Sequence, residues 1–320
     1  MADKNAAKSD LKKEINGFVN LNKPAGMTSF KCVSAVRRIT GVKKTGHAGT
    51  LDPEATGVLP VCIGKAAKCS EYFLRMGKSY RAELILGIST NTMDIWGETL
   101  NENYEAGDSV TKEQFLSVLD NFRGEITQIP PAFSAIKKDG VPLYKLARQG
   151  IEVEVESRQV TVYRNELVDF FKDSDGHTRA VIDVHCSKGT YIRSICNDIG
   201  DMLGSGAAMS SLVRTSYGEL SIENSVTLED FEKAFAEGIG DEYIIPIGFV
   251  FKNYSSVELD DKERQDYIHG KQVKVDKSRI TEKGDFDDIC VYHGGELLAI
   301  AQKQPAGNRI WLKPFRFFGD

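Results

Sequence analysis

The chain has 320 residues, of which 41% are hydrophobic and 27% are charged, fractions of an ordinary globular protein. This length allows one large core, or a catalytic domain followed by a small module. No apolar run approaches the roughly 18 residues of a membrane span, and the first residues lack the apolar core of a secretory signal. A net charge of −5 argues against a non-specific nucleic-acid coat protein.

Six cysteines are spread through the chain, with no CxxC pair and no zinc-like Cys/His spacing. Four of them lie on predicted strands or apolar helix faces. We therefore expect reduced core thiols in a cytoplasmic protein, and no metal or other cofactor.

Positive charge is concentrated at the N-terminal end. Residues 1–90 carry 15 Lys and Arg against seven Asp and Glu, whereas residues 215–320 carry 13 against 20. Residues 1–14 are polar and charged, which predicts a disordered tail. The region stays positive without the four lysines of that tail, so a polyanion such as RNA would bind this third of the chain.

After the tail, Ile15 to Leu21 is typical of a short strand. Ser29 can cap a helix whose apolar residues Phe30, Val33, Val36 and Ile39 recur at helical spacing until Gly41. Lys43 and Lys44 follow in a loop. A basic pair in a loop is usually only solvated, so phosphate contact and solvation both remain open for these two lysines.

The stretch from Gly46 to Pro60 contains three glycines and two prolines. Its glycines let the backbone take positive φ or approach a ligand closely. Asp52 precedes Pro53, which favours an extended backbone and keeps the carboxylate off a helix. Asp-Pro is also a common turn, so the residues alone leave a plain turn and a catalytic acid open.

Next, residues 65–76 are expected to form a helix, and Lys78 to Leu86 alternates as a half-buried strand. This alternation places the Tyr80 hydroxyl on the inward face, where it needs a polar partner. Residues 89–98 are loop-like. Thr111 to Gln114 is a capping box that begins a helix.

The basic segment 133–150 follows a Pro-Pro break and predicts a helix over residues 143–149. Residues 159–171 and 178–186 predict two strands joined by a hairpin. After Gly189 a helix begins with Tyr191 and Arg193 in its first turn, where a cation opposes the helix dipole and calls for an anion. Strands mixed with helices and hairpins indicate an α+β fold with a mixed or antiparallel sheet.

Thr227 caps a further helix, and a boundary falls near residues 246–249. The last roughly 70 residues predict one helix, over residues 261–268, and several short strands.

Five motifs in this order resemble the TruB family of tRNA pseudouridine synthases, from about residue 15 to about residue 250. They are Asn22–Ser29, Gly46–Pro60, Lys78–Ala82, His185–Arg193 and Ser211–Thr215. The resemblance implies a pseudouridine-synthase sheet flanked by helices. It also implies a catalytic domain at 15–248 with an RNA-gripping insertion at about 126–150, and a PUA-like β module at 249–320.

The resemblance also assigns roles to residues at the matching positions. Asp52 matches the nucleophile, Arg193 the arginine that pairs with it, and Tyr80 the residue that stacks on the flipped uridine and moves a proton. Tyr191 and Leu212 match residues that line the base pocket, and His47 the residue that fills the gap in the RNA. Lys23 and Pro24 match a motif that supports the loop.

The implied function is conversion of uridine to pseudouridine-55 in the tRNA T arm by a monomeric cytoplasmic enzyme. The T stem-loop would be its partner, without membrane or obligatory protein. Two alternatives remain. One is an RNA-binding chaperone that remodels tRNA. The other is a dyskerin-like synthase directed by a separate guide RNA.

Overall fold

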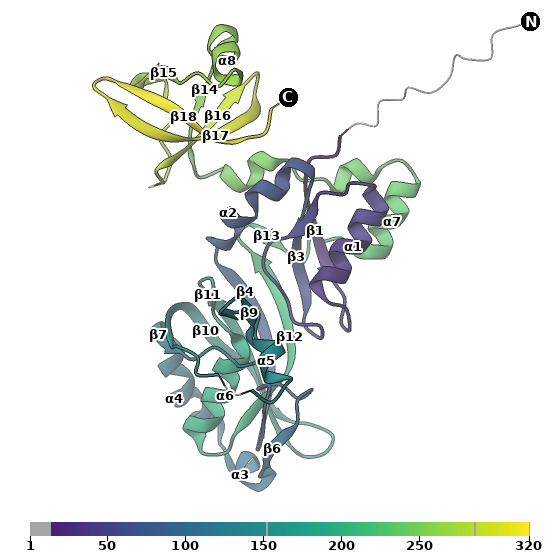
Figure 1. Cartoon of the computed structure of the whole chain (residues 1–320). Helices are drawn as coiled ribbons and strands as arrows, with labels where there is room; N and C mark the ends of the chain where they lie inside the picture. The colour runs from purple at the N-terminus through teal and green to yellow at the C-terminus, as the bar shows by residue number, and fades with distance from the viewer. Residues whose placement is uncertain (1–13, 152, 285, 320) are drawn as a thin grey trace, which may run out of the picture.

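The computed structural model describes residues 14–151, 153–284 and 286–319. It is an elongated molecule in which a larger α+β half carries the C-terminal β module at one end (Figure 1). The larger half is built on a nine-stranded mixed sheet in which β1-β3-β12-β4-β11-β10-β7 form the main path. Most neighbours are antiparallel, but β12 and β3 pair in parallel. The predicted α+β class with a mixed sheet is confirmed.

The strands of this sheet are β1 (Gly17–Lys23), β2 (Thr45–His47), β3 (Thr56–Ile63), β4 (Lys78–Leu86), β7 (Gly124–Gln128), β10 (Arg158–Lys172), β11 (Thr178–Cys186), β12 (Ala207–Tyr217) and β13 (Leu220–Ser221). The short hairpins are β5 (Ile88–Thr90) with β6 (Thr99–Glu102), and β8 (Lys137–Lys138) with β9 (Val141–Pro142). The helices are α1 (Ser29–Thr40), α2 (Ser70–Leu74), α3 (Tyr104–Ser109), α4 (Lys112–Leu119), α5 (Leu143–Ala147), α6 (Ile192–Leu203) and α7 (Leu228–Ala236). Short 3₁₀ turns are η1 (Gly64–Cys69), η2 (Asp120–Phe122), η3 (Gly240–Tyr243) and η4 (Ile247–Phe251).

Apolar side chains from α1, α4, α6 and α7 form the main core with the inward face of the sheet. The alternation predicted for residues 78–86 is confirmed, because Tyr80, Ala82, Leu84 and Leu86 are all buried in this core. The capping box of α4 is also present, with Thr111 and Gln114 bonding to each other's backbone. These helices and strands follow local signals in the sequence.

Four predicted details were wrong. Thr28 caps α1 instead of Ser29, and Phe30 is 67% exposed instead of packing inward. The segment 65–76 is not one helix, because η1 precedes the short α2. The segment 89–98 is not only loop, since it begins within β5 and leads into β6.

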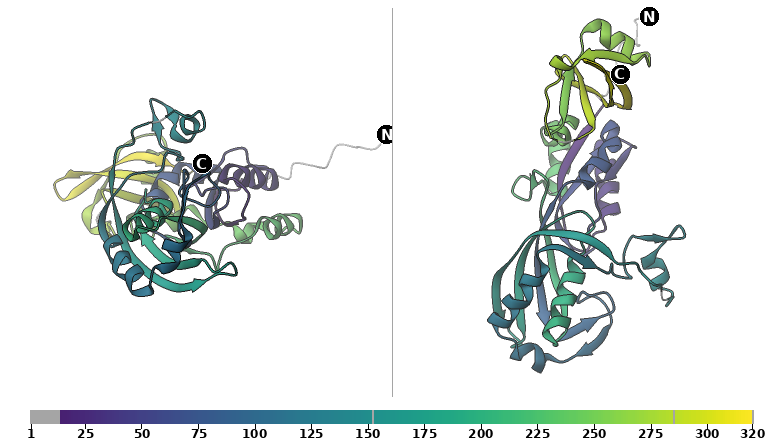
Figure 2. Two further views of the ribbon diagram at one scale, coloured as in Figure 1. Left: turned by 90° about the horizontal axis from the view of Figure 1, so that it is seen from below. Right: turned by 90° about the vertical axis from the view of Figure 1, so that its left-hand side faces the viewer.

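The basic segment leaves the sheet after β7 and projects away from the larger half (Figure 2). A helix lies where residues 143–149 predicted one, although α5 covers only Leu143–Ala147. Two backbone bonds join the segment's arms, from Leu143 to Ile136 and from Tyr144 to Ser134.

The C-terminal module is a five-stranded sheet in the order β14-β16-β17-β18-β15. Its elements are β14 (Ser255–Glu258), α8 (Asp261–Ile268), β15 (Val273–Asp276), η5 (Lys277–Arg279), β16 (Asp288–His293), β17 (Glu296–Ala306) and β18 (Arg309–Phe317). The module has its own core. A second apolar cluster is shared with the larger half and reaches from Phe318 and Phe251 to Ala48. The predicted small β module with one helix is confirmed.

Candidate active site

The loop between β2 and β3 carries Asp52, and three contacts fix its backbone. The Ser29 hydroxyl exchanges two 3.0 Å hydrogen bonds with the Leu51 N–H and carbonyl. The buried Lys23 ammonium donates to the Pro53 carbonyl at 2.7 Å. At the end of the loop, Gly57 has φ +95°, and a Cβ there would lie 2.3 Å from the Arg214 carbonyl. The loop is therefore held on both sides of Asp52.

Arg193 faces Asp52 from the first turn of α6. Its Nε lies 3.0 Å from Asp52 Oδ2, but the N–H does not point at that oxygen, so the contact is an ion pair without a hydrogen bond. The Arg193 side chain is 5% exposed and the Asp52 side chain 42%. Nη1 and Nη2 donate to the carbonyls of Thr92 and Phe133, both at 2.9 Å. The arginine is immobilised, while one side of the carboxylate stays open to solvent.

Asp94 is a second acid beside Arg193 that the sequence did not single out. Its Oδ2 lies 3.5 Å from Arg193 Nη1, and its Oδ1 accepts from the Thr92 hydroxyl at 2.6 Å. Burial raises the pKa of Asp94, and the Thr92 hydrogen bond and the Arg193 charge partly offset that shift. Arg193 thus lies between two carboxylates, which compensates for its unfavourable place at a helix N-terminus.

Tyr80 lies on β4, opposite Val184 on one neighbouring strand and Arg214 on the other. Burial raises the pKa of its hydroxyl, the Arg214 charge opposes that rise, and the charge of Asp52 adds to it. Tyr80 therefore stays protonated at neutral pH, and Arg214 lies opposite it in register on β12.

The two expected base-pocket residues come from separate elements. Leu212 on β12 pairs in register with Ala82, next to Tyr80 on β4. Tyr191 precedes α6 as its N-cap residue instead of lying in the first turn. The buried Gln128 side chain bonds both the Tyr191 N–H and its carbonyl, at 2.8 and 2.9 Å. The guanidinium of Arg158 lies 4.8 Å from the centre of the Tyr191 ring.

His47 ends β2 at the entrance to the Asp52 loop, and burial followed by the Arg214 charge lowers its pKa. The imidazole is therefore neutral at pH 7. Lys43 and Lys44 are exposed in the bend before β2, where the Gly64 N–H donates to the Lys44 carbonyl at the end of β3 away from Asp52. Among the expected site residues, only Asp52 and Arg193 form an ion pair; the two lysines lie outside that contact.

Three residues that support the site were not predicted from the sequence. Ser29 looked like a helix cap, Gln128 lay in an unremarked strand, and Asp94 lay in a segment read as a polar loop. The unfavourable charge of Arg193 was the one available signal, because it called for an anion without saying where in the chain that anion lies.

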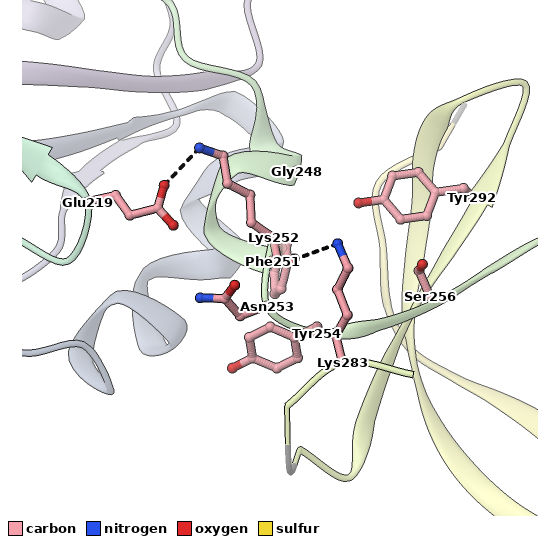
Figure 3. A pocket seen from close by; sticks show the side chains of 9 residues that line it. All are labelled: Glu219, Gly248, Phe251, Lys252, Asn253, Tyr254, Ser256, Lys283 and Tyr292. Carbon is pink, nitrogen blue, oxygen red and sulfur yellow. Dashed lines mark hydrogen bonds and ion pairs between the residues drawn. The ribbon is translucent and has the colours of Figure 1, made fainter. Parts of the chain in front are cut away.

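A separate hollow of about 510 Å³ lies where the C-terminal module meets the larger half (Figure 3). Its lysines already have partners: Lys252 contacts Glu219 at 2.8 Å, and Lys283 donates to the Lys252 carbonyl at 3.3 Å. Elsewhere in the described part of the chain, no group of three His, Cys, Asp or Glu side chains could hold a metal ion. No described helix is long and apolar enough to cross a membrane. The six cysteines are free and buried.

Comparisons with known proteins connect this geometry to a family. Residues 37–192 match the model of the TruB family pseudouridylate synthase N-terminal domain, and residues 193–247 that of the tRNA pseudouridylate synthase B C-terminal domain. The chain is 42% identical over 297 residues to tRNA pseudouridine synthase B of Clostridium tetani, covering 92% of this chain and 98% of that protein. With the protein of the same name from Clostridioides difficile it shares 39% over 308 residues, covering 95% and 100%.

Solved structures show the same fold. The archaeal box H/ACA Nop10–Cbf5 complex matches with a TM-score of 0.68 at 24% identity, covering 94% of this chain and 86% of the other. An H/ACA ribonucleoprotein bound to a substrate RNA containing 2′-deoxyuridine matches with a TM-score of 0.69 at 23% identity, covering 99% and 94%. At these identities the likeness concerns the fold alone.

Proposed function

Because the chain belongs to the TruB family of pseudouridylate synthases, we propose that it acts on uridine 55 in the T arm of tRNA and that Asp52 is its nucleophile. The chain is an enzyme that isomerises uridine in tRNA. The observation that carries the proposal is the partly exposed Asp52 carboxylate, held 3.0 Å from the buried Arg193 guanidinium.

The reaction requires a nucleophile and proton transfers. Pseudouridine formation breaks the C1′–N1 bond, turns the uracil, forms a C1′–C5 bond, and moves a proton from C5 to N1 without any redox change. A carboxylate suits this role because it is already ionised at neutral pH. Arg193 holds the Asp52 carboxylate in one orientation while leaving its open side toward the incoming base.

The remaining roles concern the flipped uridine. Extruding a base costs a few kcal/mol, and stacking on an aromatic ring returns roughly 1–3 kcal/mol. Tyr80 would stack on the uracil and move the proton, because its hydroxyl stays protonated at neutral pH. Tyr191 and Leu212 would line the base pocket, and His47 would fill the gap left in the RNA.

Lys43 and Lys44 would contact phosphates, since both are exposed in the positive third of the chain. On single-stranded RNA, log affinity falls with log salt by about 0.7 per phosphate neutralised. Replacing both lysines by Gln should make this slope shallower in filter-binding measurements at several salt concentrations. An unchanged slope would place the RNA on another face.

We propose the same domain division for the folded chain: a tail to residue 14, a catalytic domain at 15–248 with the RNA-gripping insertion at about 126–150, and a PUA-like module at 249–320. Residues 1–13 lie outside the described part of the chain. The division is supported by the second family match, which stops at residue 247, and by the module's own core. We also propose a cytoplasmic monomer, because tRNA is modified in the bacterial cytoplasm.

The decisive experiment uses the purified chain with a bare T stem-loop and no guide RNA. Wild type should form pseudouridine, and Asp52→Asn should form none, because the amide lacks the nucleophilic oxygen. Glu54→Gln is the matched control, since it removes a neighbouring charge from the same loop and should retain turnover. Pseudouridine formed by Asp52→Asn would refute the nucleophile assignment.

The same experiment separates the two alternatives. Wild type inactive on the bare stem-loop but active with a guide RNA would favour the dyskerin-like mode. A chaperone role would appear as faster refolding of misfolded tRNA that survives in Asp52→Asn. RNA binding by that variant should match or exceed wild type, because one negative charge near the phosphates is gone.

A further inference from the structure

Arg214, on β12, is the largest fully buried side chain described, at 1% exposure. Within the described residues, no acidic side chain forms an ion pair with it. An unpaired charge in the interior is costly unless its hydrogen bonds are met by other groups. The groups that meet them here are all parts of the proposed active site.

The Arg214 guanidinium bridges the two ends of the Asp52 loop. Its Nε donates to the Val58 carbonyl at 2.6 Å, and Nη2 donates to the Gly49 carbonyl at 3.2 Å. Gly49 precedes Asp52 and Val58 follows it, so one rigid group spans the loop. Tyr80 lies opposite Arg214 in register on the neighbouring strand β4, and the Arg214 charge opposes the rise in the pKa of the Tyr80 hydroxyl. Arg214 thus connects the proposed nucleophile's loop to the proposed proton-transfer group.

The Tyr217 ring packs against that guanidinium, and Lys78 lies over the same ring. The Arg214 guanidinium carbon lies 5.0 Å from the centre of the buried Tyr217 ring, and the Lys78 ammonium lies 4.3 Å from the same centre. Both distances suit cation–π contact, which is stronger in a desolvated site. The Tyr217 ring also supports the loop directly, because a Cβ on Gly49 would lie 3.2 Å from it.

We propose that Arg214 is the positioning residue of this site: it fixes the Asp52 loop and the Tyr80 hydroxyl relative to each other, and the Tyr217 ring holds it in place. The inference rests on the proposed roles of Asp52 and Tyr80. Arg214 is buried beneath the loop and does not touch substrate. Its effect is on the geometry of the reacting groups, where a displacement of about 1 Å can cost 10²-fold in rate.

The test compares Arg214→Lys and Arg214→Met in the full chain with the T stem-loop. Lysine keeps the charge but cannot reproduce the planar fork that reaches two carbonyls at once. We expect both variants to lower kcat roughly 10²-fold while KM stays within about threefold, because ground-state binding is untouched. Arg123→Met is the control: this arginine also donates two hydrogen bonds to the backbone, both to the Asn165 carbonyl, and its loss should leave wild-type kcat.

A double-mutant cycle excludes a merely structural role. In the Tyr80→Phe background, Arg214→Met should cost less than it does in wild type, since part of its effect passes through the missing hydroxyl. Additive losses, full recovery by Arg214→Lys, or a raised KM with unchanged kcat would each overturn the inference. If Arg214→Met does not fold, Tyr217→Leu removes the supporting ring and should lower kcat alone; unchanged kcat there would also overturn it. An inactive wild type would instead refute the proposed function.

Discussion

The larger half buries several positively charged side chains, whereas the C-terminal module keeps its positively charged side chains near the surface. In the larger half, Lys23, Lys78 and Arg214 are buried and bond to backbone carbonyls, and Arg193 is buried between two carboxylates. In the C-terminal module the cations stay near the surface. There, for example, Arg279 pairs with Glu263 at 2.6 Å, the arginine side chain being 39% exposed.

The buried cations hold the geometry of the site, whereas the exposed cations only interact with solvent and with surface acids. Burying a cation costs several kcal/mol of desolvation, which its hydrogen bonds only partly repay. Exposed ion pairs contribute about 0–1 kcal/mol each. Lys23, Arg193 and Arg214 contact the loop that carries Asp52, and Lys78 lies over the Tyr217 ring beneath Arg214, so we infer that this half accepts a stability cost to hold that loop.

Arg193→Met should have the largest effect. It leaves Asp94 buried without its cation and frees the Asp52 carboxylate, so activity should fall roughly 10³–10⁴-fold. The free energy of unfolding should drop by about 2–4 kcal/mol, as expected for breaking a largely buried ion pair. Single-turnover assays and urea denaturation would measure the two effects. Normal activity in this variant would contradict the inference that buried cations of the larger half hold the site.

Tyr80→Phe removes only a hydroxyl from the same buried cluster. If that hydroxyl moves a proton, kcat should fall roughly 10²–10⁴-fold while affinity for the T stem-loop stays close to wild type. Rate and binding measured on the same preparation would separate the two properties. A near-normal rate would reduce Tyr80 to a stacking surface.

Lys78→Met tests the stability cost of burying this cation through the pH dependence of the free energy of unfolding. Burial and then the Arg214 charge lower the pKa of Lys78 from 10.5 to about 8. Between pH 8 and 10.5 the unfolded chain therefore holds a proton that the folded chain has lost, so this group makes wild-type stability rise with pH. The variant should lack this rise, a difference of about 1–3 kcal/mol across the window.

Denaturation curves for both proteins at several pH values would give this difference. The other titrating groups are common to both proteins and cancel in the subtraction. Among the groups near Lys78, Cys186 has its pKa raised from 9.0 to about 11, so above pH 9 it makes stability fall with pH, opposite to the effect of Lys78. A difference that stays constant with pH would contradict the prediction.

Arg279→Met should have the smallest effect. Its ion pair lies on the surface of the C-terminal module, so unfolding should weaken by no more than about 1 kcal/mol and turnover should not change. Thermal melting and the stem-loop assay would check both. A loss as large as that of Arg193→Met would show that charges in the two halves contribute alike.

Local patterns in the sequence determined much of the fold. The alternation over residues 78–86 fixed which face of β4 is buried, and capping signals at Thr111 and Thr227 placed the starts of α4 and α7. These predictions succeed because each depends on neighbours within one or two turns of the chain. The order of the five motifs likewise identified the family.

Tertiary structure alone decided how the site is assembled. Asp94 and Arg193 are 99 residues apart in the chain, and Arg214 and Gly49 are 165 apart. The periodicity of a single helix or strand could therefore predict neither contact. Ser29 shows the same limit: it looked like a helix cap, but its hydroxyl holds Leu51, 22 residues further along the chain. Sequence periodicity reports which face of an element is buried. Which polar partner a buried side chain meets depends on how distant elements pack, and that geometry exists only in the folded chain.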